Sequence, residues 1–464
     1  MATGTAPPKN DLLLLASLFL WEVAIAAMAM AMYMKGDRSF TVFLSSSPGL
    51  VFLLAITVFF IAGAVVIHQY QGCKRSPSRH FHLIVTMNLV TALLILITGE
   101  IAMRMLARTT VEGETLGSRV LIPKNWGELT RHNRQLLDEA NTRPTFSVYD
   151  DLMGWTVGPS RRSANGLYYS SSEGIRAPHE DVSFAELTEK TRIALVGDSY
   201  TFGEDVAYED TWGFLLENAL GSEIQVLNFG VPGYGVDQAY LRYEKDVRKW
   251  KPKVVIFSFI AHDVERTMTV YTSLNYPGWN MPFSKPRFIL RDGDLKKLNV
   301  PPLAPEAIFS RGSISELPFL EYDRGYRQSD WRRSFFQFSY LARAFMTWLP
   351  RWEAVTPDVS DEALVSVNAS ILRAFVRSAE EAGAAPIVVY HPKREFNNSS
   401  SSYVPLGKRV LQEAGLVYTD PTSCLLELDQ ADWFIPHGHY TAKGNAMVAK
   451  CLVKAVRQVL GEVS

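Results

Sequence analysis

The chain has 464 residues, of which 47 are Lys or Arg and 48 are Asp or Glu, so its formal net charge is -1. This length allows two or three domains with ample core, and the balanced charge gives no basic excess of the kind that binds nucleic acid. No cluster has metal-ligand spacing and no glycine-rich nucleotide loop occurs, so neither a metal nor a cofactor is expected.

The N-terminal third holds three apolar segments, at Leu12–Met34, Gly49–Tyr70 and Leu83–Ala102. Each is about as long as a helix that crosses a bilayer. A cleaved signal peptide would explain one such segment but not three, and buried core helices are the alternative. We predict three transmembrane helices in a membrane domain at residues 1–105. Glu22, midway along the first helix, predicts an inter-helix or inter-subunit contact and hence a possible membrane-protein partner.

Charged residues in the loops predict the orientation of these helices. The loop between the second and third segments holds Lys74, Arg75 and Arg79 without an acid, so it should be cytoplasmic. The third helix then delivers the rest of the chain to the periplasmic or extracellular side of the inner (plasma) membrane. Arg104 and Arg108, just past that helix, argue mildly for the opposite orientation.

A polar connector and lead-in at residues 106–190, with one helix expected at Trp126–Glu139, precede a domain at 191–464. In that domain, apolar strand-like runs alternate with helical patterns, which argues for a parallel sheet covered on both faces. The expected strands are Arg192–Val196, Ile224–Phe229, Val254–Phe259, Pro386–Tyr390 and, more weakly, Leu416–Tyr418. The expected helices are Thr211–Leu220, Val236–Lys249, Asp361–Ala382, Gly407–Glu413 and Ala442–Leu460.

A stretch at about 266–357, rich in Pro and aromatic residues, interrupts this alternation. It contains a hairpin signal at Arg287–Leu295 with Asp292-Gly293 at the turn. A structureless loop of this length would be unusual, so we predict a folded insertion. It could cap an active site, or it could be a membrane-surface or partner-docking element.

The three cysteines are too few for a disulfide framework. Cys73 lies in the predicted cytoplasmic loop and cannot pair with the other two. Cys424 and Cys451 both lie in the exported part, where they form either one disulfide or two buried free thiols.

The most informative segment is Gly197-Asp198-Ser199-Tyr200-Thr201-Phe202-Gly203, which follows the apolar run Ile193–Val196. Sites in open α/β sheets form just beyond the carboxyl ends of strands, so Ser199 is well placed as a nucleophile. A serine needs a base within hydrogen-bond reach, and His439, just before the last helical pattern, is the candidate. The alternatives are that Ser199 caps the helix that follows it and that His439 is an ordinary exposed histidine.

These blocks resemble the SGNH (GDSL) hydrolase family, in the membrane-linked bacterial type that includes lipases, esterases and O-acyltransferases. The resemblance extends to Val226–Gly235 and covers roughly residues 150–464. It implies a three-layer α/β/α fold with a flavodoxin-like strand order. It also implies that Ser199 attacks an ester and that His439 carries the proton.

The resemblance further implies an oxyanion hole that includes the backbone N–H groups of Ser199 and Gly233. The family's third donor is an asparagine, and His262 stands in its place, either as a substitute donor or as a neutral core histidine. Where many members have an orienting aspartate, this chain has His437. The nearest carboxylate is Asp432, so a Ser–His dyad oriented by Asp432 or by a carbonyl is expected.

Together these patterns predict a membrane-anchored serine esterase or O-acyltransferase, bound to the lipid bilayer through its helices. Its substrate would be an acyl ester, acetyl esters included, of an envelope glycan or lipid. The alternative is a catalytically weak or inactive subunit that serves a membrane complex as a scaffold, which the departures at His262 and His437 support.

Overall fold

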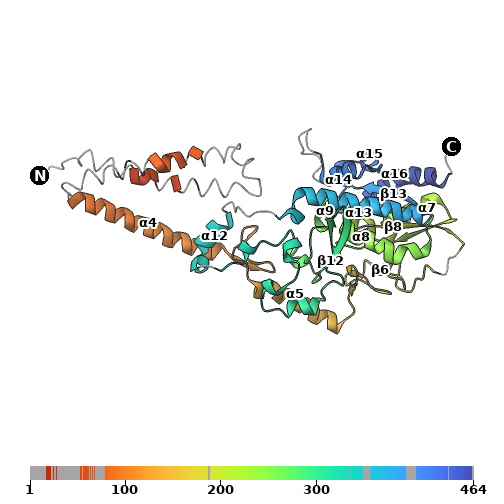
Figure 1. Ribbon diagram of the computed structural model, residues 1–464, viewed down its shortest axis with the longest axis horizontal. Helices are drawn as coiled ribbons and strands as arrows, with labels where there is room; N and C mark the ends of the chain where they lie inside the picture. Colours follow the sequence, from red (N-terminus) through yellow and green to blue (C-terminus); the bar gives the residue numbers. More distant parts are fainter. Residues whose placement is uncertain are drawn as a thin grey trace. The chain divides into compact units, whose positions relative to one another are not determined.

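The computed structural model describes residues 79–185, 189–333, 335–348, 356–392, 404–436 and 438–461, with scattered positions between 17 and 67. The chain divides into two compact units (Figure 1). Unit 1 comprises Met1–Glu128 and Arg327–Ala354, and unit 2 comprises Leu129–Tyr326 and Val355–Ser464.

Unit 2 is built on a parallel sheet of β8 (Thr191–Val196), β9 (Ile224–Asn228), β10 (Val254–Phe259) and β13 (Ala385–Tyr390). Their spatial order is β13-β10-β8-β9, and every pair is parallel. The predicted flavodoxin-like order is therefore confirmed for these strands, because the second strand lies outside the first and the third and fourth follow on the other side. The predicted strand at Leu416–Tyr418 is wrong, since only the next residue, Thr419, forms a single parallel bridge, to Val389.

Side chains alternate between the two faces of this sheet and contribute to two apolar cores. In β8, Ile193 and Leu195 belong to one core and Ala194 and Val196 to the other. Helices α7 (Trp212–Leu220) and α16 (Ala442–Leu460) supply the first core. Helices α8 (Val236–Arg242) and α13 (Asp361–Glu381) supply the second, which makes the predicted α/β/α sandwich.

Helix α8 is shorter than the expected Val236–Lys249, because it loosens into a π-helical turn at Tyr243–Val247 and a 3-10 turn at Arg248–Trp250. The remaining helices of unit 2 lie close to their predicted positions or are short. They are α5 (Trp126–Thr142, which begins in unit 1), α6 (Ser199–Phe202), α9 (Ala261–Arg266), α10 (Thr272–Asn275), α11 (Pro305–Phe309), α14 (Leu406–Ala414) and α15 (Thr422–Leu425).

Six short antiparallel strands precede or interrupt the main sheet of unit 2 in three two-stranded pairs, and the predicted hairpin is one of these pairs. These pairs are β4 (Ser147–Asp150) with β5 (Gly154–Val157), β6 (Tyr169–Ser170) with β7 (Arg176–Ala177), and β11 (Arg287–Arg291) with β12 (Asp294–Leu298). The hairpin turns at Asp292-Gly293 as predicted. The insertion is therefore folded, but its residues 327–354 belong to unit 1 rather than to unit 2.

Unit 1 contains the long helix α4 (Arg79–Leu106), a sheet of β1 (Arg108–Thr110), β2 (Gly113–Leu116) and β3 (Arg119–Val120), and α12 (Tyr340–Trp348). Within the described part of the chain, α4 alone has a stretch long and apolar enough to cross a membrane, at Asn88–Leu106. This stretch matches the third predicted segment. The first two segments, with Glu22, lie largely outside the described residues, so three membrane helices remain a prediction.

Glu100 of α4 joins the two stretches of chain that form unit 1. Its carboxylate accepts the backbone N–H groups of Tyr340 and Leu341, at 3.0 and 2.9 Å, and the hydroxyl of Ser339 at 2.8 Å. A carboxylate at a helix N-terminus satisfies otherwise unpaired N–H groups and complements the helix dipole. Glu114 adds side-chain contacts to Tyr340 and Arg343.

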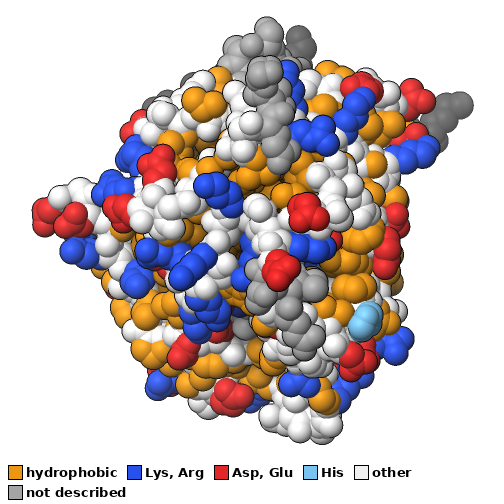
Figure 2. All heavy atoms as spheres, turned by 90° about the vertical axis from the view of Figure 1, so that its right-hand side faces the viewer, with side chains coloured by type: hydrophobic (Ala, Val, Ile, Leu, Met, Phe, Trp, Pro, Cys, Tyr) orange, Lys and Arg blue, Asp and Glu red, His pale blue; other side chains and the backbone are white. Residues whose placement is uncertain are grey.

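Charged side chains lie at both edges of the unit 2 sheet. At the amino ends of β8, β9 and β10, a hollow of about 690 Å³ is bordered by five cations: Lys190, Arg192, Lys249, Lys251 and Lys253. On the face drawn in Figure 2, Lys and Arg side chains are interspersed with Asp and Glu. Beyond the carboxyl ends of β8 and β10, by contrast, Asp198 and Asp263 are buried. The second edge carries the predicted site.

Candidate active site

Ser199 lies at a sharp turn between β8 and α6. Asp198 caps this helix by accepting the backbone N–H of Tyr200 at 3.0 Å, so Ser199 is not the cap. Gly197 is required here, because a Cβ atom at this position would lie 2.0 Å from Thr201 Oγ1 and 2.4 Å from the carbonyl oxygen of Ser258. The turn therefore leaves the Ser199 hydroxyl available to a partner outside its own helix.

That partner is His439, which is brought to Ser199 from the opposite end of the chain. Its Nε2 lies 2.9 Å from Ser199 Oγ. The loop that carries it ends at Thr441, whose side chain caps α16 by accepting the N–H of Gly444. The distance is short enough for the imidazole to take the hydroxyl proton.

The second imidazole nitrogen contacts Asp205, which sequence reasoning missed. His439 Nδ1 lies 2.6 Å from Asp205 Oδ2, so Nδ1–H donates to this carboxylate when the imidazole is neutral and Nε2 accepts from Ser199. Asp205 has a left-handed backbone, with φ of 69°, and its N–H donates to the Tyr168 hydroxyl at 2.9 Å. This turn points the Asp205 carboxylate toward the imidazole of His439.

The prediction that Asp432 orients His439 is wrong, because the Asp432 carboxylate lies elsewhere. The Asp432 carboxylate instead pairs with Lys443 at 2.9 Å on the exposed start of α16, and its backbone carbonyl accepts from Thr441. The sequence signal for the contact between Asp205 and His439 was the acidic pair Glu204 and Asp205, directly after the glycine that ends α6. No rule of residue spacing connects this pair to His439. His437, the other departure, lies outside the described residues.

The two expected oxyanion donors have unoccupied N–H groups. In the part of the chain that the structure describes, no hydrogen bond is recorded from the backbone N–H of Ser199 or of Gly233. Gly233 has φ of 82°, a left-handed conformation that favours glycine. The loop before it is held where the Trp155 indole donates to the Pro232 carbonyl at 3.1 Å and the Val231 N–H donates to the Gly197 carbonyl.

A family model described as GDSL-like Lipase/Acylhydrolase matches residues 193–278, which hold the nucleophile turn and Gly233. This segment is similar to the GDSL lipase/acylhydrolase family. No curated protein matches the chain.

Solved structures similar to this chain include three hydrolase-family proteins. One is a lipase/acylhydrolase from Enterococcus faecalis, at 14% identity and a TM-score of 0.30, over 57% of this chain and 95% of that one. Another is a member of the lipolytic protein G-D-S-L family from Veillonella parvula, at 12% identity and a TM-score of 0.28, over 57% and 96%. The third is a catalytic mutant of the acetylxylan esterase Axe2 from Geobacillus stearothermophilus, at 15% identity and a TM-score of 0.30, over 58% and 95%.

Unit 2 places a second carboxylate beside the same imidazole. Glu204 Oε2 lies 3.6 Å from His439 Nε2, and burial raises the pKa of Glu204, an effect that the nearby imidazole and Arg266 oppose. Tyr200 packs its ring edge-to-face against the imidazole, 5.3 Å between centroids, and donates its hydroxyl to the Gly438 carbonyl at 2.5 Å. The histidine is therefore fixed from several sides.

His262, the expected third hydrogen-bond donor of the oxyanion hole, is not a core histidine. Its side chain is 41% exposed and its Nε2 lies 3.9 Å from Glu265 Oε2. Its part in an oxyanion hole stays a prediction. The neighbouring Asp263 holds the loop in place, because it accepts the Ile260 N–H at 2.9 Å and pairs with Arg266 at 2.5 Å.

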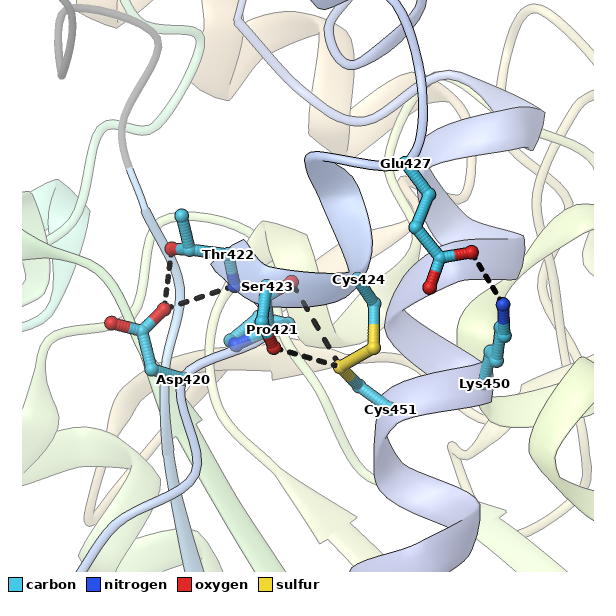
Figure 3. The surroundings of a disulfide bond; sticks show 8 residues. All are labelled: Asp420, Pro421, Thr422, Ser423, Cys424, Glu427, Lys450 and Cys451. Carbon is cyan, nitrogen blue, oxygen red and sulfur yellow. Dashed lines mark hydrogen bonds and ion pairs between the residues drawn. A yellow bond between two sulfur atoms is a disulfide. The ribbon is translucent and has the colours of Figure 1, made fainter.

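Cys424 of α15 and Cys451 of α16 form a disulfide, which decides between the two alternatives left open by the sequence (Figure 3). Beside it, Glu427, two residues past the end of α15, pairs with Lys450 of α16 at 2.5 Å. Among the described residues, no group of three or more His, Cys, Asp and Glu side chains could hold a metal ion.

Proposed function

We propose that this protein is a membrane-anchored serine esterase whose catalytic unit faces the periplasm or the extracellular space. Its substrates are acyl esters, acetyl esters included, carried by a glycan or lipid of the cell envelope. The observation that carries the proposal is the chain of contacts from Ser199 through His439 to Asp205, with separations of 2.9 and 2.6 Å.

The chemistry proceeds through an acyl-enzyme. Ser199 Oγ attacks the ester carbonyl carbon while His439 Nε2 takes the hydroxyl proton, and Asp205 stabilises the resulting imidazolium. The N–H groups of Ser199 and Gly233 stabilise the negative oxygen of the tetrahedral intermediate. His439 then gives its proton to the departing alcohol oxygen. Water, activated by the same histidine, attacks the acyl-enzyme and releases the carboxylic acid.

A sugar hydroxyl in place of that water would make the protein an O-acyltransferase, and the residues of the site serve either acceptor. The contacts at His439 favour catalysis over a scaffold role. A scaffold has no need for a serine, a histidine and a carboxylate aligned within hydrogen-bond distance.

Two observations support the compartment. The basic loop with Lys74, Arg75 and Arg79 favours a cytoplasmic position between the second and third predicted helices. The Cys424–Cys451 disulfide lies in the catalytic unit, and disulfides persist mainly in oxidising compartments such as the periplasm and cell surface.

The nucleophile can be tested directly in the full-length, detergent-solubilised protein. We expect a fluorophosphonate probe to label the protein and p-nitrophenyl acetate to be hydrolysed, and Ser199→Ala to abolish both. Labelling that persists in Ser199→Ala would remove Ser199 from the mechanism. Absence of labelling and hydrolysis in the unmodified protein would favour the scaffold instead.

A further inference from the structure

Two side chains of the insertion lie directly over Gly233. A Cβ atom built on this glycine would lie 3.1 Å from the Met281 sulfur and 3.3 Å from Cζ3 of the Trp279 indole. Both side chains are half-buried. The residue expected to bind the oxyanion through its N–H group therefore has a thioether and the edge of an aromatic ring on the side where a Cβ atom would point.

This indole is held in place by buried charge. Trp279 stacks on Tyr276, with 4.2 Å between ring centroids and 14° between planes, and the Arg266 guanidinium lies 5.0 Å from the indole centroid. Arg266 is itself paired with Asp263 at 2.5 Å and lies 3.6 Å from Asp198, the residue before the nucleophile. The aromatic side chain thus cannot swing away freely from the serine turn.

The next question is which part of a substrate Trp279 and Met281 would contact. The leaving alcohol must lie on the side of His439, because that histidine donates its proton. The side-chain contacts recorded for His439 come from residues 199–205, whereas the side chains over Gly233 come from residues 279–281. An acyl substituent directed away from the alcohol would then approach the second group.

We propose that Trp279 and Met281 form the wall against which the acyl group packs, and that this wall restricts the enzyme to short acyl groups, with acetyl preferred. The proposal rests on the esterase function proposed above. An acetyl methyl group fits beside side chains in van der Waals contact with Gly233. A longer chain must displace the thioether or the indole, which its stacking on Tyr276 and the buried Arg266 resist.

The test compares kcat/KM for p-nitrophenyl acetate, butyrate and hexanoate, each corrected for the rate with Ser199→Ala, in the full-length protein. We expect the unmodified enzyme to prefer acetate. Trp279→Ala and Met281→Ala, separately, should raise the hexanoate-to-acetate ratio about tenfold or more, because each methylene accommodated or excluded is worth roughly one order of magnitude or more. Trp331→Ala is the matched control, since Trp331 is an insertion tryptophan that packs against Trp126 within unit 1.

The outcomes separate this inference from the function on which it rests. Fluorophosphonate labelling of Ser199 in each variant reports that the site is still formed. A ratio that stays constant in labelled Trp279→Ala and Met281→Ala, or that rises equally in Trp331→Ala, would overturn the acyl wall while the esterase function stands. A wild-type protein without Ser199-dependent hydrolysis would overturn the esterase function, and the acyl wall with it.

Discussion

At the scale of single residues, two carboxylates that are neighbours in the chain approach different nitrogens of one imidazole. Asp205 lies at Nδ1, and Glu204 lies 3.6 Å from Nε2, the nitrogen that also faces Ser199. An ionised Glu204 would favour a proton on Nε2 and would compete with the serine. Because burial raises the pKa of Glu204, this carboxyl takes up a proton more readily than an exposed glutamate, which weakens the competition.

The role of Asp205 can be measured by removing its charge. We expect Asp205→Asn to reduce kcat on p-nitrophenyl acetate by up to about 10⁴-fold, because an amide neither stabilises the imidazolium nor selects the productive tautomer. The matched control is Asp432→Asn, which alters a carboxylate paired with Lys443 and should leave kcat within about twofold. A large loss in Asp432→Asn with little loss in Asp205→Asn would reverse the assignment.

The motifs at Ser199 and His439 predicted the two residues that the fold brings together, since each stands at the boundary of a recognisable element. Asp205 could not be predicted in the same way. Its carboxylate reaches the imidazole only because Gly203 ends α6 in a left-handed conformation and Asp205 itself adopts another, and neither local backbone angle follows from residue spacing.

At the scale of elements, the four main strands were predictable because each contains a run of mostly apolar, buried residues, as strands covered on both faces do. The weak strand at Leu416–Tyr418 failed for the opposite reason. Val417 is 94% exposed, so that segment has no second face to bury and pairs only at Thr419. Helix α8 was predicted too long because its polar pattern continues through the π-helical and 3-10 turns that follow it.

The pairing of α15 with α16 depends on the disulfide between Cys424 and Cys451. This bond closes a loop with a sequence separation of 27, and a loop of that size restricts the unfolded chain by about 3 kcal/mol. We expect the double variant Cys424→Ser/Cys451→Ser to lower the free energy of unfolding by about 2–4 kcal/mol, measured by denaturant unfolding of the full-length protein.

Reducing agent provides the control for this measurement. Dithiothreitol should lower the unfolding midpoint of the unmodified protein toward that of the double variant, and it should leave the variant unchanged. A midpoint insensitive to both reduction and substitution would show that the Glu427–Lys450 pair and the apolar contacts of α16 suffice to hold the two helices.

At the scale of the whole molecule, the sequence predicted that the insertion folds but not that it is divided between the units. Residues 266–326 stay with the catalytic unit, where Trp279 and Met281 contact Gly233, and residues 327–354 join the unit that contains α4. The partners that decide this division are Glu100 and Glu114, which are distant in sequence. No local pattern specifies such a pairing.

The proposed orientation of the chain has a direct test in living cells. A reporter that is active only outside the cytoplasm should be active when fused after Ser464. A reporter that requires the cytoplasm should work when inserted near Ser76, because the basic loop there is retained inside. The reverse pattern of activities would place unit 2 in the cytoplasm and would contradict an envelope substrate.

The contacts of Glu100 and Glu114 also set an order of events during synthesis. Glu114 meets Arg343 across 229 positions, and Glu100 meets the N–H of Leu341 across 241, so the ribosome must translate half of the chain before unit 1 can close. Closing so long a loop costs only about 3 kcal/mol more than closing one of ten residues. The long separation therefore delays the closure of unit 1 during synthesis but adds little to its free-energy cost. A nascent chain that stalls before residue 339 therefore contains α4 without the partners that Glu100 contacts in the finished protein.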